Sequence, residues 1–311
     1  MQSPLGIVDA LVLGLVEGIT EALPVSSTGH LVVTASLLGL DEPEQVREAM
    51  DTLLIVIQGG AILAVLWLFR QSIGSMIRGL LGKNRPGLQL TRNVVLAFLP
   101  AAVLGPLLDD WIEARLMQAG PVLVALAAGG LVMILSDRRL RRDANPDRDL
   151  SGEQLTVKAA LLIGLLQCVA MWPGTSRLMM TLLGGMLVGM RPAAAARFSF
   201  LLALPTIGGA TVYKLLKNVT ADHANMFEVL GWTPILIGIL VAAVAALFTI
   251  RWLMHYLSSH GLVAFGWYRL GLTAVLVGFI AGGIVSIGPA DAAQSEALTT
   301  RPPAPIAKTL G

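Results

Sequence analysis

The stretch GLVEGITEALPVSSTGHL, residues 14–31, carries two carboxylates, four hydroxyl groups and an imidazole within an otherwise apolar run. The carboxylates belong to Glu17 and Glu21, and the imidazole belongs to His30. Charged side chains are costly to bury in apolar surroundings, so they occur there mainly where a function uses them. The stretch therefore marks a candidate functional site.

The composition of the 311-residue chain excludes an ordinary soluble domain. Hydrophobic residues make up 55% of the chain, charged residues make up 14%, and the mean hydropathy is +0.74. Aromatic residues are scarce at 5%, and 33 glycines favour closely packed helices over a membrane β-barrel. A single cysteine, Cys168, excludes an intramolecular disulfide and a thiol cluster for zinc. We expect an all-α polytopic membrane protein.

Six apolar runs approach the length of a membrane span, which takes about 17 to 25 residues with its flanks. They are residues 52–69, 94–108, 119–136, 198–212, 234–250 and 270–287. Two further apolar regions, 7–40 and 159–190, are interrupted by turns that contain proline and hydroxyl residues. Because each half is too short to cross, we expect six transmembrane spans plus two re-entrant helical hairpins with turns buried in protein or lining a wet cavity.

The two interrupted regions match each other at a nearly constant spacing of 149 or 150 residues. The matching pairs are Gly14 and Gly164, Pro24 and Pro173, Ser27 and Ser176, and the Gly-Gly-Ala triplets at 59–61 and 208–210. Because three spans separate the hairpins, the second copy should be inverted relative to the first. We expect one membrane domain at 1–288, with repeats at about 1–137 and 150–288, and a loose C-terminal tail at 289–311.

The charges along the chain predict its orientation in the membrane. The connection 70–92 holds five Lys or Arg residues and no acid, and the connection 137–158 holds six Lys or Arg residues. The positive-inside rule places both connections in the cytoplasm. The acid-rich segments 41–51 and 109–115 should then lie outside, as should both termini.

Glu17 and Glu21 are four residues apart and therefore share one face of a helix, where like charges repel each other. A solvated helix face at the membrane interface is the plain explanation. A bound cation or a cationic partner would remove the repulsion, and two carboxylates together with phosphate oxygens suit a hard ion such as Mg²⁺ or Ca²⁺. We therefore predict that Glu17 and Glu21 bind a divalent cation.

Hydroxyl residues also follow the first turn, just before the next apolar run. Ser26, Ser27 and Thr28 stand where a helix begins, and simple capping of that helix explains them. The free N–H groups at a helix start also attract anions. We therefore predict that Ser26 and Thr28 bind phosphate.

The second turn repeats this arrangement and adds a positive charge. Thr175 and Ser176 are followed by Arg177 and another apolar run. Capping explains the hydroxyls, but it does not explain a guanidinium within an apolar hairpin. If an inverted repeat brings the two turns together, two helix N-termini and Arg177 converge opposite the two carboxylates, and Thr175 and Ser176 join the phosphate site.

Several stretches resemble the integral-membrane undecaprenyl-diphosphatase family, also called the bacitracin-resistance proteins. They are EGITEALPVSSTGHL (17–31), IVIQGGAILAV (55–65), WPGTSR (172–177) with Thr181 and GGML, and FSFLLALP (198–205). The resemblance covers roughly residues 4–287. It implies hydrolysis of undecaprenyl diphosphate to undecaprenyl phosphate and inorganic phosphate, which recycles the lipid carrier of cell-envelope polymers. It also implies a bacterial plasma (inner) membrane location with the site facing outward.

The resemblance also implies which residues act. By position, the family's functional residues fall on Glu17, Glu21, Ser27, His30, Ser176 and Arg177. We take Glu21, Ser27, His30 and Arg177 as the catalytic set. The family usually has a serine directly after the arginine, and here Leu178 replaces it, which removes one potential hydrogen bond to phosphate.

The chemistry of this set leaves alternatives open. His30 is three residues from Ser27, close enough for the imidazole to take the hydroxyl proton or to shuttle one to water. Alternatively, His30 is a hydrogen-bonded residue that only shapes the turn. Ser27, His30 or a metal-bound water could attack phosphorus. Gln58 and Gln167 are polar in apolar runs, and either line the site or form interhelical hydrogen bonds.

A transporter or flippase for a phosphate-bearing lipid or anion is the alternative function, because inverted repeats with broken hairpins are typical of transporters. A nucleophile, a base and metal ligands together exceed what binding requires, so the sequence favours an enzyme. The expected partners are a polyprenyl diphosphate lipid and the bilayer, with no nucleic acid. A homodimer is compatible with the sequence.

Overall fold

The computed structural model describes residues 5–40, 44–142, 150–220 and 225–282, and this part of the chain contains helices and no strand. The helices are α1 (Ile7–Glu21), α2 (Ser27–Leu37), α3 (Glu44–Leu68), α4 (Arg70–Leu80), α5 (Arg85–Leu116), α6 (Ala119–Arg142), α7 (Val157–Val169), α8 (Arg177–Leu187), α9 (Pro192–Val219), α10 (Met226–Leu230), α11 (Trp232–Ser259) and α12 (Val263–Ala281). The prediction of an all-α protein is confirmed.

Five of the described helices, α5, α6, α9, α11 and α12, are long and apolar enough to cross a membrane. Helix α3 adds a sixth if it is counted together with α4, which leaves it at a bend of 78°. Each predicted apolar run overlaps one of these six helices. Large apolar side chains such as Leu107, Trp232 and Phe248 are exposed on the outside, as lipid contact requires. The chain is a multi-pass membrane protein.

The segments that we predicted as connections from their charge are partly helical. Helix α4 and the beginning of α5 occupy most of 70–92, and α5 continues through 109–115 to Leu116. Asn84 caps α5 by accepting a hydrogen bond from the backbone N–H of Gly87 at 3.2 Å. Charged residues can form helices outside hydrocarbon, so the charge pattern does not report backbone conformation. The predicted tail at 289–311 lies outside the described residues.

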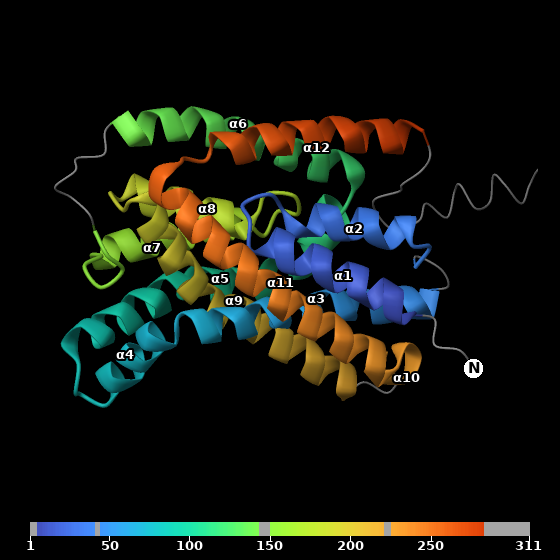
Figure 1. The fold of residues 1–311 in the computed structure, drawn as a ribbon, viewed down its shortest axis with the longest axis horizontal. Coiled ribbons are helices and arrows are strands. Elements are labelled where there is room, and N and C mark those ends of the chain that lie inside the picture. The colour runs from blue at the N-terminus through green and yellow to red at the C-terminus, as the bar shows by residue number, and fades with distance from the viewer. Residues whose placement is uncertain (1–4, 41–43, 143–149, 221–224, 283–311) are drawn as a thin grey trace, which may run out of the picture.

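Two helical hairpins interrupt the series of long helices. Helices α1 and α2 contain 15 and 11 residues, and α7 and α8 contain 13 and 11 residues. At about 1.5 Å per residue, the longest of them spans about 22 Å, less than the roughly 30 Å of a hydrocarbon core. Figure 1 shows the blue α1–α2 hairpin and the yellow-green α7–α8 hairpin meeting near the middle of the molecule.

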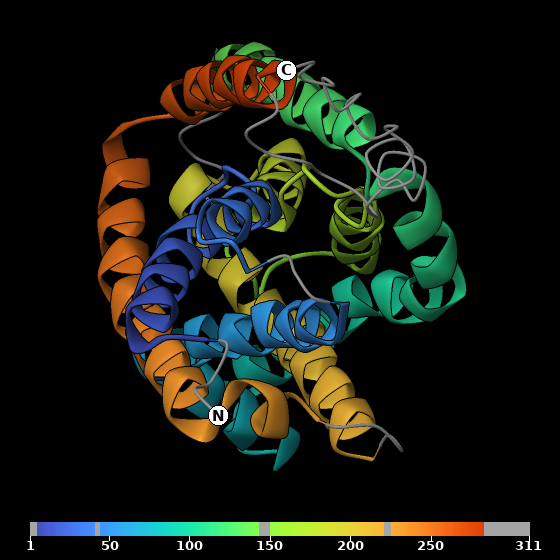
Figure 2. The same ribbon diagram turned by 90° about the vertical axis from the view of Figure 1, so that its right-hand side faces the viewer.

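Each hairpin is held by a long helix that is distant in sequence. Helix α1 packs along α11, and α7 packs along α5. Gly14 faces the carbonyl oxygen of Gly238, and Gly164 faces that of Ala97, so closely that a Cβ at either glycine would collide with backbone. Helices α6 and α12 run side by side along one edge of the molecule (Figures 1 and 2). Small residues at crossing points thus fix where the two turns lie.

Gly14→Ala should destabilise the protein, because the new methyl group must push α1 away from α11. We expect the free energy of unfolding to fall by about 1–3 kcal/mol, as for other overpacked sites. Gly271→Ala on α12 is the matched control, since a Cβ at Gly271 meets no atom within 4 Å. Thermal unfolding in detergent measures both variants, and equal unfolding temperatures would contradict this packing.

Candidate active site

The two turns end in serines with an unusual backbone conformation. Ser26 has φ 76° and ψ 99°, and Ser176 has φ 73° and ψ 115°. A positive φ costs a non-glycine residue about 1–3 kcal/mol, and such strain is common at functional sites. Ser26 and Ser176 are the N-caps of α2 and α8 and lie 150 positions apart, as Gly14 and Gly164 do. The backbone therefore pairs Ser176 with Ser26, one residue from the Ser27 that the sequence match selected.

The capping prediction holds for only one of these serines. The Ser176 hydroxyl accepts a hydrogen bond from the backbone N–H of Met179 at 3.4 Å. The Ser26 side chain makes no capping bond to α2. Apart from the Met179 N–H that Ser176 caps, the first N–H groups of α2 and α8 have no partner within their own helix and can bind an anion.

A cavity of about 160 Å³ lies where the two turns meet. Six predicted site residues line it, namely Glu21, Ser26, Ser27, Thr28, Ser176 and Arg177. Gln58, Trp172, Leu178 and Ile207 complete much of the wall. The predicted residues Glu17, His30 and Thr175 do not line the cavity. Its volume accommodates a phosphate group and water, but not a long hydrocarbon chain.

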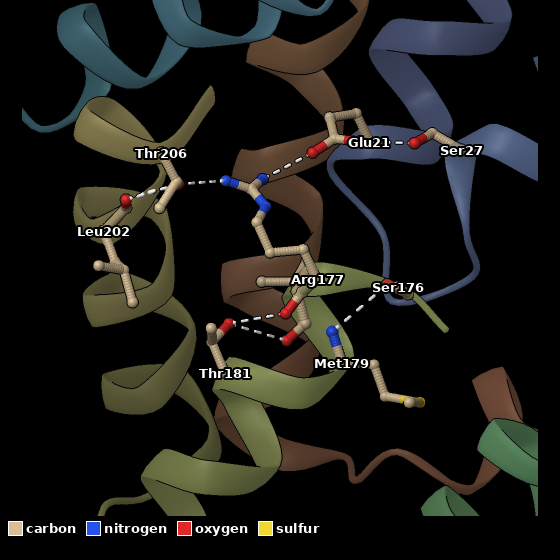
Figure 3. Close-up of polar contacts among 9 residues, drawn as sticks. Glu21, Ser27, Ser176, Arg177, Met179, Thr181, Leu202 and Thr206 are labelled. Carbon is tan, nitrogen blue, oxygen red and sulfur yellow. Dashed lines mark hydrogen bonds and ion pairs between the residues drawn. The ribbon is translucent and has the colours of Figure 1, made fainter. Parts of the chain in front are cut away.

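An ion pair links the two hairpins at this cavity. The Arg177 guanidinium donates to Oε1 of Glu21 at 2.6 Å (Figure 3). The exposed fractions of the Arg177 and Glu21 side chains are 20% and 12%. The guanidinium also donates to the hydroxyl of Thr206 on α9 at 3.2 Å. The Ser27 hydroxyl donates to Oε2 of Glu21 at 2.6 Å. Glu21 thus joins a hydroxyl to a guanidinium, the arrangement of a nucleophile with an oriented base.

Glu17 lies one helical turn before Glu21 and is fully buried. Neither of its carboxylate oxygens has a hydrogen-bond partner among the described residues. Gln167, which is 150 positions later, is also buried, and its amide has no such partner either. Gln167 therefore neither lines the cavity nor forms an interhelical hydrogen bond within the described part of the chain.

Few side chains near the cavity could act as ligands of a metal ion. Within the described residues, no three His, Cys, Asp or Glu side chains cluster in a way that could hold a metal ion. The unpartnered oxygens of buried Glu17 fit the predicted cation. Glu21 fits it less well, because its two oxygens already accept from Arg177 and Ser27. Arg177 relieves the repulsion between the two carboxylates by pairing with Glu21. It is thus a cationic partner, which the sequence offered as the alternative to a bound cation.

The structure does not join His30 to Ser27. The ring Nδ1 of His30 lies 2.7 Å from the Ser26 carbonyl oxygen, and its Nε2 lies 2.7 Å from the Tyr268 hydroxyl. Ser27 is bonded to Glu21 instead. The carboxylate, rather than the imidazole, therefore contacts the predicted nucleophile.

Three contact residues of the site were not predicted. Thr206 bonds Arg177, Tyr268 bonds His30, and Arg269 donates to the carbonyl oxygen of Gly174 in the second turn at 2.8 Å. Arg269 carried a usable signal, because it is an arginine directly before an apolar run with no acid nearby in sequence. Thr206 and Tyr268 are ordinary residues of apolar helices, and only the fold shows their partners.

A helical membrane fold that joins a serine, a carboxylate and a guanidinium beside two helix N-termini is the arrangement of an integral-membrane hydrolase for phosphate compounds. A family model described as bacitracin resistance protein BacA matches residues 10–275. The chain belongs to this family.

Named relatives agree with the family assignment. A protein of Sorangium cellulosum (strain So ce56), named undecaprenyl-diphosphatase, is 45% identical over 271 residues, covering 86% of this chain and 85% of its own. Undecaprenyl-diphosphatase 1 of Burkholderia cenocepacia (strain HI2424) is 42% identical over 276 residues, covering 87% and 95%. Undecaprenyl-diphosphatase 1 of Paraburkholderia xenovorans (strain LB400) is 44% identical over 274 residues, covering 87% and 94%.

The strain at Ser26 can be tested by substitution. Ser26→Gly should leave the unfolding temperature in detergent unchanged or raise it, because glycine adopts a positive φ freely. Ser26→Val should lower stability by about 1–3 kcal/mol, since a β-branched residue tolerates this backbone poorly. Ser36→Val, the same exchange within α2, is the control. Equal effects of valine at both positions would show that Ser26 is not strained.

Proposed function

We propose that this protein hydrolyses undecaprenyl diphosphate to undecaprenyl phosphate and inorganic phosphate. The observation that carries the proposal is the chain of contacts from the Ser27 hydroxyl through Glu21 to Arg177, with both links 2.6 Å long. The names of the relatives support the choice of substrate. The small cavity, which Glu21, Arg177 and hydroxyl residues partly line, suits the terminal phosphate of the substrate, and the exposed apolar surface of the protein suits contact of the polyprenyl tail with lipid.

The contacts suggest a route for the reaction. Ser27 Oγ attacks the terminal phosphorus while its proton passes to Glu21, and the bond from that phosphorus to the bridging oxygen breaks. Undecaprenyl phosphate leaves with the bridging oxygen. Water then attacks the phosphorus of the phosphoserine, and the bond from phosphorus to Ser27 Oγ breaks. Oγ takes back the proton from Glu21, and inorganic phosphate leaves with the oxygen and the protons of the water. The described residues occupy two of the five N–H donors of Arg177, so the others can bind phosphate oxygens.

The remaining polar groups fit supporting roles. The hydroxyls of Ser26, Thr28 and Ser176 line the cavity together with the starts of α2 and α8, and can donate to the terminal phosphate. Thr175 is buried beside the cavity without lining it, so its contribution to phosphate binding would be indirect. His30 contacts Ser26 and Tyr268 and supports the turn.

A divalent cation, Mg²⁺ or Ca²⁺, is part of the proposal. Glu17 and Glu21 would hold it, with Glu17 as the stronger ligand, because its carboxylate oxygens have no partner among the described residues whereas both oxygens of Glu21 already accept hydrogen bonds. When bound, the cation would neutralise charge on the diphosphate. A buried Glu17 carboxylate without a partner among the described residues is costly in an apolar core, and a bound cation would offset that cost.

The proposal also covers the architecture. Each half of the chain would contain three spans and one re-entrant hairpin, and the second half would be inverted relative to the first. The reciprocal packing supports it, because α1 lies on α11 of the second half whereas α7 lies on α5 of the first half. The equivalent close contacts of Gly14 and Gly164 support it as well. The charge pattern supports a cytoplasmic location for the connections at 70–92 and 137–158. We propose a bacterial inner-membrane location with the cavity facing outward.

Phosphate release from a polyprenyl diphosphate by the purified protein in detergent tests the function. We expect turnover with added divalent cation, and a loss of about 10²–10⁴-fold for Ser27→Ala, which removes the nucleophile. Ser258→Ala, at an exposed hydroxyl on α11, is the control and should be unaffected. Binding of the lipid without turnover by the wild-type protein would instead support a carrier.

Glu17→Gln should sharply reduce turnover and weaken its dependence on added divalent cation, because glutamine keeps the shape and removes the charge that binds the ion. Glu228→Gln on α10, which is not among the residues that line the cavity, should leave the cation dependence unchanged. Turnover is measured in a titration of Mg²⁺ and of Ca²⁺ after chelation. A Glu17→Gln variant with the wild-type cation response would remove Glu17 from the metal site.

A further inference from the structure

Two neighbouring residues of α12 each contact a different hairpin. The Tyr268 hydroxyl lies 2.7 Å from Nε2 of His30, and the two rings are stacked with centroids 5.8 Å apart and an angle of 7° between their planes. Arg269 contacts Gly174 in the second turn. Neither residue belongs to the hairpins, yet together they connect both hairpins to the same helix.

The contacts of His30 determine which ring nitrogen carries the proton and which keeps the lone pair. The Ser26 carbonyl oxygen can only accept a hydrogen bond, so Nδ1 of His30 must carry the proton in that contact. In the neutral ring, Nε2 therefore keeps the lone pair, and the Tyr268 hydroxyl donates to it. Tyr268 thus covers the only basic atom of the imidazole and fixes its tautomer.

Arg269 acts on the second turn through backbone carbonyls. Its side chain is fully buried, and it donates to Ala125 at 3.1 Å and Leu126 at 3.2 Å, both on α6, besides Gly174. Gly174 has φ +93° and lines the cavity two residues before Ser176. A buried guanidinium requires such partners, so the turn and α6 are held at a defined separation.

We propose that Tyr268 and Arg269 form a clamp that positions both halves of the catalytic cavity. Tyr268 holds His30 in one tautomer and shields its Nε2, and Arg269 holds the turn that presents Ser176 and Arg177. Both are positioning residues, since neither lines the cavity. Their effect on turnover rests on the proposed diphosphatase function, but the Tyr268 half of the clamp can be tested without substrate.

Modification of His30 by diethyl pyrocarbonate tests the Tyr268 half of the clamp, because the reagent attacks an unprotonated ring nitrogen. Tyr268→Phe keeps the stacked ring and removes the hydroxyl, so the modification rate should rise about two- to tenfold, as for the loss of one hydrogen bond. Tyr213→Phe, an exposed tyrosine on α9, is the control. Mass spectrometry of the peptide that contains His30 measures the rate. An unchanged rate in Tyr268→Phe would overturn this half.

Gly129→Ala tests the Arg269 half without removing any residue of the cavity. A Cβ at Gly129 on α6 would collide with the Arg269 guanidinium, which must then shift from the Gly174 carbonyl. We expect kcat/KM for the polyprenyl diphosphate to fall about tenfold or more, the range of a small misplacement of catalytic groups. Gly120→Ala, also on α6, meets no atom within 4 Å and should be unaffected.

The two measurements together separate a clamp from a general loss of structure. In Gly129→Ala, the modification rate of His30 should stay at the wild-type value, because the Tyr268 hydroxyl is untouched. A raised rate in that variant would indicate general loosening and contradict the clamp. An unchanged kcat/KM in an active protein would overturn the Arg269 half. If the wild-type protein shows no turnover, the proposed function fails, and the modification rates still decide the Tyr268 half.

Discussion

The contact between Arg177 and Glu21 is the interaction on which the site depends. It joins residues 156 positions apart, from two hairpins that the chain order keeps separate. Both side chains are largely buried, so leaving either charge unpaired would be costly. The same contact balances one of two adjacent carboxylates and fixes the oxygen that receives the Ser27 hydroxyl. One ion pair therefore neutralises a buried charge, holds the two hairpins together and orients the predicted nucleophile.

The surrounding scaffold makes this contact geometrically specific. Glycines let α1 pack closely against the backbone of α11, and α7 against that of α5, which fixes where each turn lies. The two N-cap serines adopt strained backbone angles, and this strain persists because the packing on either side determines the path of the chain. Thr206 holds the second nitrogen of the Arg177 guanidinium from α9. Rigid helices thus supply the precision that a loop-borne site would otherwise lack.

Much of this arrangement was predictable because apolar length, charge and turn chemistry are local properties. These local properties predicted both hairpins and the approach of Arg177 to Glu21. They also predicted the apolar runs that overlap α3, α5, α6, α9, α11 and α12. The contact of Ser27 with Glu21 rather than His30 was not predictable, because residues at a helix start can face several directions. The last apolar run in the sequence starts at residue 270 and leaves out Arg269, because a charged residue normally marks the end of a span. The carbonyl partners of Arg269 lie on α6 and in the second turn, and only the fold brings them together.

A double-mutant cycle on Glu21 and Arg177 tests most directly whether the two residues act as one unit. The measured quantity is kcat/KM for phosphate release from a polyprenyl diphosphate in Glu21→Gln, Arg177→Gln and the double variant. Because each single change leaves the other partner uncompensated, the double variant should lose no more activity than the worse single variant. Losses that simply multiply in the double variant would show that the two residues act independently, and would contradict the central role of this ion pair.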